Sequence, residues 1–76
     1  MTLVKVDSSM ISAVGYDEKS CTMEVVFNTG RIYEYLDVSK EVFDGLVAAE
    51  SKGRYMLGHV IDCYEYREVR GRRQRF

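Results

Sequence analysis

The chain has 76 residues, of which 46% are hydrophobic and 30% charged, and a formal net charge of −1 at pH 7. This length fits one small domain with a small core, and the composition excludes an extensively disordered chain. The apolar runs are only a few residues long, as at residues 25–27, which excludes a membrane-spanning helix. With no basic start followed by an apolar stretch, we expect a cytoplasmic protein without membrane contact.

The first half of the chain shows the period-of-two alternation that is typical of β-strands. Three such segments, separated by polar or glycine-containing turns, occur at residues 10–16, 21–28 and 31–37. In the first segment, this period puts Ile11 and Ala13 on one face and Val14 on the other. The short turns between the segments predict an antiparallel meander.

The period changes to 3.6 in the second half of the chain. A helix is expected over about residues 40–51, with Ser39 as its N-cap and Gly53 just beyond its end. A second short helix is expected at 54–62, and residues 63–69 favour a late strand. The sequence thus predicts a single α+β domain with a small antiparallel sheet of three to four strands. Its order is β-β-β-α, followed by the second short helix and the late strand, with the helices on one face of the sheet.

The charge is distributed unevenly along the chain. Residues 67–76 carry five arginines and one glutamate, a charge of +4, which leaves −5 for residues 1–66. Clusters of arginine attract polyanions. We therefore divide the chain into a domain at 1–69 and a basic tail at 70–76, which we expect to be flexible.

The residues that could support catalysis or metal binding are few. Cys21 and Cys63 are expected to be reduced thiols, and with His59 they make three candidate ligands where a structural zinc site usually takes four. The glycines are scattered and form no phosphate-binding loop, and no nucleophile stands beside a base and an orienting group. We expect no catalytic residues, no metal and no cofactor, which favours a non-enzymatic module.

An ordered set of short motifs resembles the KTSC domain family. The set comprises Val-Asp-Ser-Ser at 6–9, Val-Gly-Tyr-Asp at 14–17, Tyr-Glu-Tyr at 33–35, and the Ala-x-Ser-x-Gly-x-Tyr pattern at 49–55. The resemblance covers about residues 5–69. This domain occurs at the C-terminus of some lysyl-tRNA synthetases and alone in small bacterial and phage proteins. The resemblance implies RNA binding, suspected from the synthetase context, and no catalytic residues.

The sequence departs from the family pattern after Tyr55. There the family usually has Phe-Asn and then an Ile followed by a basic residue, whereas this chain has Met56-Leu57 and Val60-Ile61. An apolar second helix would favour a protein partner.

Two functional hypotheses follow. The favoured one is association with RNA or another polyanion, in which tail arginines contact phosphates. Period-of-two alternation puts Arg31, Tyr33 and Tyr35 on one strand face, which would stack on bases. Its candidate residues are Arg67, Arg70, Arg72, Arg73, Arg75, Arg31, Tyr33 and Tyr35. Tyr33 and Tyr35 have an alternative place in the core, and the sequence leaves that choice open.

The second hypothesis is a protein–protein adaptor. It would dock on a larger machine, such as RNA polymerase, where it would regulate transcription, or an aminoacyl-tRNA synthetase. Its candidate anchor is Tyr55, Met56 and Leu57. The sequence identifies neither the partner, the host nor the oligomeric state.

Overall fold

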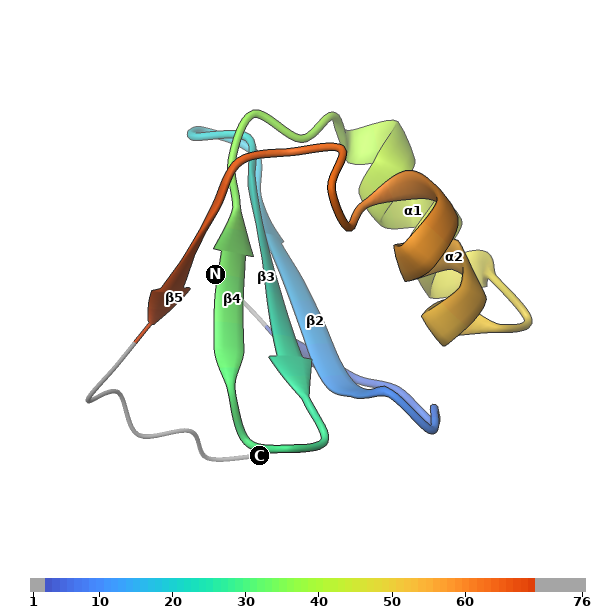
Figure 1. Ribbon diagram of the computed structural model, residues 1–76. Coiled ribbons are helices and arrows are strands. Elements are labelled where there is room, and N and C mark those ends of the chain that lie inside the picture. The colour runs from blue at the N-terminus through green and yellow to red at the C-terminus, as the bar shows by residue number, and fades with distance from the viewer. Residues whose placement is uncertain (1–2, 70–76) are drawn as a thin grey trace.

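The computed structural model describes residues 3–69, which form five strands and two helices (Figure 1). In chain order these are β1 (Leu3–Lys5), β2 (Ile11–Asp17), β3 (Thr22–Phe27), β4 (Ile32–Tyr35), α1 (Lys40–Ala48), α2 (Lys52–His59) and β5 (Tyr66–Val69). The strands form one antiparallel sheet in the order β1-β2-β3-β4-β5. The chain leaves the sheet after β4, forms both helices over one face, and returns to pair beside β4 (Figure 1).

The α+β class is confirmed, but the prediction of three to four strands is wrong because the sheet has five. The late strand expected within 63–69 is present as β5. The strand missing from the prediction is β1, which pairs with β2 in the register Leu3↔Gly15. Three residues are too few for a period-of-two pattern to be distinguished from chance, so this strand is defined by its pairing.

A β-bulge changes the predicted faces of β2. The register between β2 and β3 shifts between Ile11 and Ala13, because a bulge inserts one extra residue. Ile11 and Val14 therefore lie together in the core beneath the helices, while Ala13 packs with Val26 on the opposite face. The expectation that Ile11 and Ala13 share a face was wrong for this reason.

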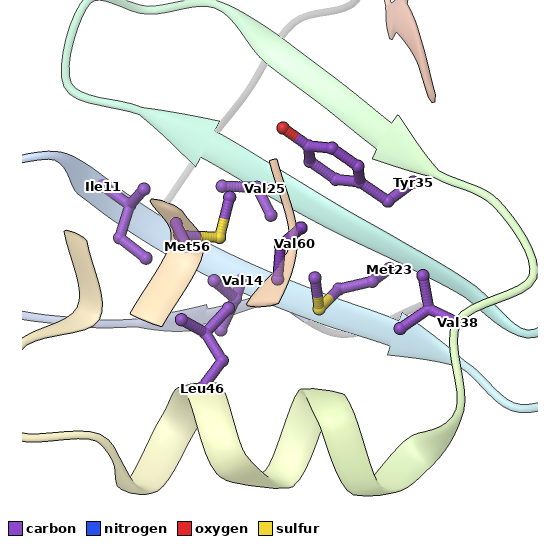
Figure 2. Packing of buried hydrophobic residues seen from close by; sticks show 9 residues of the cluster. All are labelled: Ile11, Val14, Met23, Val25, Tyr35, Val38, Leu46, Met56 and Val60. Carbon is purple, nitrogen blue, oxygen red and sulfur yellow. The ribbon is translucent and has the colours of Figure 1, made fainter. Parts of the chain in front are cut away.

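The main core lies between the sheet and the two helices (Figure 2). Among the described residues, α1 contributes the buried side chain of Leu46 and α2 that of Met56. Figure 2 shows Met56 among Ile11, Val14 and Val25 of the sheet. Burying one such side chain stabilises the folded state by about 1.5–3 kcal/mol. The attachment of each helix to the sheet therefore depends strongly on its buried residue.

The helix boundaries differ from the prediction near Gly53. The first helix ends at Ala48, and Ser51 begins the second, where its Oγ accepts a hydrogen bond from the backbone N–H of Arg54 at 3.3 Å. Gly53 therefore lies in the first turn of α2. A Cβ added at this glycine would lie 3.4 Å from the Cβ of Met10. It does not cap α1, because the serine cap starts a new helix before that glycine is reached.

Gly45 and Gly58 provide a matched pair for testing how the helices pack. A Cβ at Gly45 in α1 would clash with the hydroxyl end of the Tyr55 ring, whereas a Cβ at Gly58 in α2 would meet nothing within 4 Å. We expect Gly45→Ala to lower the free energy of unfolding by about 1–2 kcal/mol, because the Tyr55 ring must leave its site. Gly58→Ala should raise it by about 0.5–1 kcal/mol through helix propensity alone.

Urea denaturation followed by circular dichroism measures both changes. A Gly45→Ala protein as stable as the Gly58→Ala protein would contradict the close packing of α1 against α2.

Candidate nucleic-acid interface

A groove of about 280 Å³ lies on the helix-bearing face of the sheet, over β4 and β5. Its apolar lining comes from Phe27 of β3, Tyr33 and Tyr35 of β4, Tyr66 of β5, and Ile61 after α2. Its polar groups belong to Thr29, Arg31 and Asp62. An aromatic groove with a few polar groups at its border is the usual form of a small-ligand or base-binding site.

Strand alternation and strand pairing together build the aromatic wall. Alternation along residues 31–35, which end in β4, turns Arg31, Tyr33 and Tyr35 to the same side, as the sequence predicted. Pairing then sets Tyr66 opposite Tyr35. The Tyr66 ring stacks on Tyr33, with the ring centroids 5.0 Å apart and the planes 21° from parallel. The wall therefore exists before any ligand arrives.

The three tyrosines differ in exposure, and this difference shows which of them belong to the core and which to the surface. Tyr35 is a core residue with only 2% of its surface exposed, Tyr33 is half-buried, and Tyr66 is 55% exposed. Tyr66 is thus the most accessible ring of the groove, yet it was not among the predicted site residues. The sequence shows an aromatic residue in the late strand, but it does not show that this strand pairs with β4.

Burial raises the pKa of Tyr35 to about 12. Desolvation is the largest cause, followed by the neighbouring Tyr33 and Tyr66 and then by the carboxylate of Asp62. Asp62 also lines the groove and lies four residues before Tyr66, the register partner of Tyr35, so a carboxylate stands toward the Tyr35 end.

Arg31 supplies the positive charge of the groove. Its side chain is 63% exposed, and Nη1 lies 3.8 Å from Glu68 Oε1. The Glu68 side chain is 24% exposed, so only the arginine end of this pair is open to solvent, and from there the guanidinium can reach a ligand in the groove.

Arg67 lies away from this groove. Its Nε donates a hydrogen bond to Glu34 Oε1 at 2.8 Å, and these two residues are register partners on the opposite face of the sheet. The structure therefore does not bring Arg67 together with Arg31 and Tyr33. The remaining predicted phosphate contacts lie outside the described residues: Arg70, Arg72, Arg73 and Arg75.

The candidate protein-binding triplet does not form one surface. Tyr55 Oη donates to the carbonyl of Val42 at 3.0 Å, Met56 is fully buried, and Leu57 is 63% exposed. Consecutive helical residues point about 100° apart, so three in a row cannot share a face. The prediction of Met56 as an exposed anchor was wrong, because this side chain fills the core.

The cysteines lie in different environments, Cys21 as a half-buried thiol and Cys63 as an exposed one. Within residues 3–69, no group of three or more His, Cys, Asp or Glu side chains is placed to hold a metal ion. In the same part of the chain, neither helix is long and apolar enough to cross a bilayer.

Comparison with known proteins gives consistent matches. The family model of the KTSC domain matches residues 7–66. A protein of Tsukamurella paurometabola is 47% identical over 55 residues, which cover 72% of this chain and 82% of that protein. A lysine–tRNA ligase of Nostoc punctiforme is 36% identical over 67 residues, which cover 88% of this chain but 12% of the ligase. The crystal structure of a KTSC domain protein from Yersinia pestis superposes with a TM-score of 0.85 at 30% identity, covering 90% of this chain and 96% of that one.

The raised pKa of Tyr35 predicts how stability depends on alkaline pH. Below pH 10 this hydroxyl is protonated in both the folded and the unfolded chain. Between pH 10 and about 12 the unfolded chain loses this proton and the folded chain keeps it, so the contribution to stability is lost as pH rises. Absorbance of the phenolate during an alkaline titration should show a late ionisation step near pH 12 that belongs to Tyr35. Tyr35→Phe should remove that late step, and a titration unchanged by this substitution would contradict the assignment.

Met56 and Leu57 are adjacent residues with opposite environments. Met56→Ala should lower the free energy of unfolding by about 2–4 kcal/mol, because it leaves a cavity between α2 and the sheet. Leu57→Ala should change it by no more than about 0.5 kcal/mol. Thermal denaturation measures both, and equal effects at the two positions would contradict the described orientation of α2.

Proposed function

Since this chain belongs to the KTSC domain family, we propose that it is a non-enzymatic cytoplasmic module that binds single-stranded RNA. An unpaired base enters the aromatic groove, and the arginines of the tail contact neighbouring phosphates. The observation that carries the proposal is the stacked Tyr33–Tyr66 pair, with Tyr66 exposed and Arg31 lining the same groove. Proteins recognise unpaired bases by stacking them on aromatic rings and on arginine.

The charge distribution supports a division of roles between the domain and the tail. Residues 3–69 carry seven basic and twelve acidic side chains, a net charge of −5, which opposes the approach of phosphate. The tail carries four arginines and no acidic residue. Arg70 is four residues from Tyr66, so at most about 14 Å of extended chain separates them. A base on Tyr66 and an adjacent phosphate are therefore within reach of one short segment.

The relatives add support of a limited kind. Lysine–tRNA ligases, which are named for a tRNA substrate, contain a segment similar to nearly all of this chain. That segment is 12% of the ligase, so the similarity extends no ligase activity to this chain. The shared domain instead favours a partner in common, which is RNA.

A protein–protein adaptor on RNA polymerase or a synthetase is the second candidate. Leu57 of α2 and Val47 of α1 are apolar and exposed, so Leu57 could anchor an adaptor without Met56. Binding through this anchor would depend on Leu57 and would be unaffected by Tyr66.

Fluorescence anisotropy with labelled single-stranded RNA tests the proposal. Tyr66→Ala should weaken binding about 5- to 150-fold, the effect of losing one base–aromatic stack. A chain ending at residue 69 should bind more weakly. Its log–log dependence of affinity on salt should be shallower by about 0.7 for each phosphate that the tail no longer neutralises.

Leu57→Ala is the matched surface control and should leave RNA affinity unchanged. Circular dichroism verifies that every variant is folded. Absence of RNA binding by the full chain at low salt would overturn the proposal, as would full affinity in Tyr66→Ala.

A further inference from the structure

The two charged side chains of the groove differ in sign and in position. Arg31 immediately precedes β4, beside the β3–β4 turn, where its carbonyl accepts a hydrogen bond from the N–H of Phe27. Asp62 follows α2 and lies four residues before Tyr66. Tyr66 is the register partner of Tyr35, which is four residues after Arg31. Four strand residues span about 13 Å, and the aromatic wall lies between these points. A hydrogen-bond donor therefore stands toward one end of the groove and an acceptor toward the other.

We propose that this groove selects guanine among the unpaired bases, with Asp62 and Arg31 as the reading residues. The inference rests on the proposed function and specifies its ligand. Guanine presents two adjacent donors, N1–H and the N2 amino group, on one edge, and two adjacent acceptors, O6 and N7, on another. A carboxylate accepts from the first pair, and a guanidinium donates to the second.

The other bases do not match this arrangement. Adenine and cytosine each present a ring nitrogen acceptor beside a single amino donor, so a carboxylate would face a lone pair. Uracil presents one N–H between two carbonyl oxygens, which a carboxylate also opposes. A mismatched base leaves the carboxylate desolvated without a hydrogen-bond donor, which weakens the binding of that base. The site discriminates among the bases through this difference in affinity.

Asp62 is held in place before a ligand binds. Its φ of 67° lies in the left-handed region, which Asp tolerates better than most side chains. The turn around it is fixed by hydrogen bonds from Ile61 N–H to Met56 O at 2.7 Å and from Cys63 N–H to Val60 O at 3.0 Å. Met56 and Val60 are both fully buried, so the turn is attached to the core. An acceptor fixed in this way needs little rearrangement to meet a base.

The test uses short uridine oligonucleotides that carry one central G, A, C or inosine. The full chain should bind the G oligonucleotide about tenfold more tightly than the A or C oligonucleotide. Inosine lacks the N2 amino group, so the affinity for its oligonucleotide should lie between that for G and those for A and C. Asp62→Asn should reduce affinity for G to the level of A, because an amide cannot accept from both donors.

Asp37→Asn is the matched control, because Asp37 is also exposed with a φ of 57° but does not line this groove. It should leave the preference for G intact. Equal affinity for all central bases would overturn the guanine inference while leaving the proposed RNA function in place. A preference for G that survives Asp62→Asn would overturn the role of Asp62.

Guanosine monophosphate is the second arm, because a guanine base also occurs on free nucleotides. Weak competition by the nucleotide supports RNA as the source of the base. If guanosine monophosphate competes at concentrations as low as the unlabelled G oligonucleotide does, guanine selection is supported but single-stranded RNA is overturned as the ligand. Absence of binding by every probe would overturn both proposals.

Discussion

The pairing of β5 with β4 is the interaction on which the candidate site depends. The register Tyr35↔Tyr66 joins residues 31 positions apart, and the hydrogen bond from Leu36 N–H to the carbonyl of Glu65 at 2.8 Å closes the connection. The intervening chain forms both helices, which pack on the sheet. The same segment of chain therefore contributes to the core and brings β5 to the groove. Loop closure over this length carries an entropic cost that the helix contacts offset.

The aromatic side chains of β4 serve the core and the groove together. Tyr35 is almost fully buried and also lines the groove, while Tyr33 contacts Phe27 edge-on and Tyr66 by stacking. Substitution of either β4 tyrosine would therefore alter stability and, under the proposed function, binding at once. Tyr66 stands at an edge strand with its ring half exposed, so it is the position where binding separates most cleanly from folding.

The sequence predicted those features that local patterns determine. The strands at β2, β3 and β4, the two helices and the shared face of Arg31, Tyr33 and Tyr35 all follow from periodicity. It could not predict the bulge in β2, because an inserted residue leaves no compositional trace. Tyr66 and Asp62 reach the groove through long-range pairing and a turn after α2, neither of which has a local signature. Met56 and Leu57 have the same apolar character, and helical spacing alone does not say which of them faces inward.

Charge separation between the domain and its tail constrains which nucleic acid could bind. Phosphate contacts supply affinity and base contacts supply selectivity, and under the proposed function the two fall on different parts of the chain. A domain of net charge −5 disfavours the dense phosphate array of a duplex, whereas a single strand can present one base to the groove with few phosphates nearby. Under the proposed function, residues 3–69 are thus a selective but weak binder that depends on the arginines of residues 70–76. A domain of this kind would need basic residues supplied either by a short arginine tail or by a larger protein, and similar segments are found both in a small protein and in lysine–tRNA ligases.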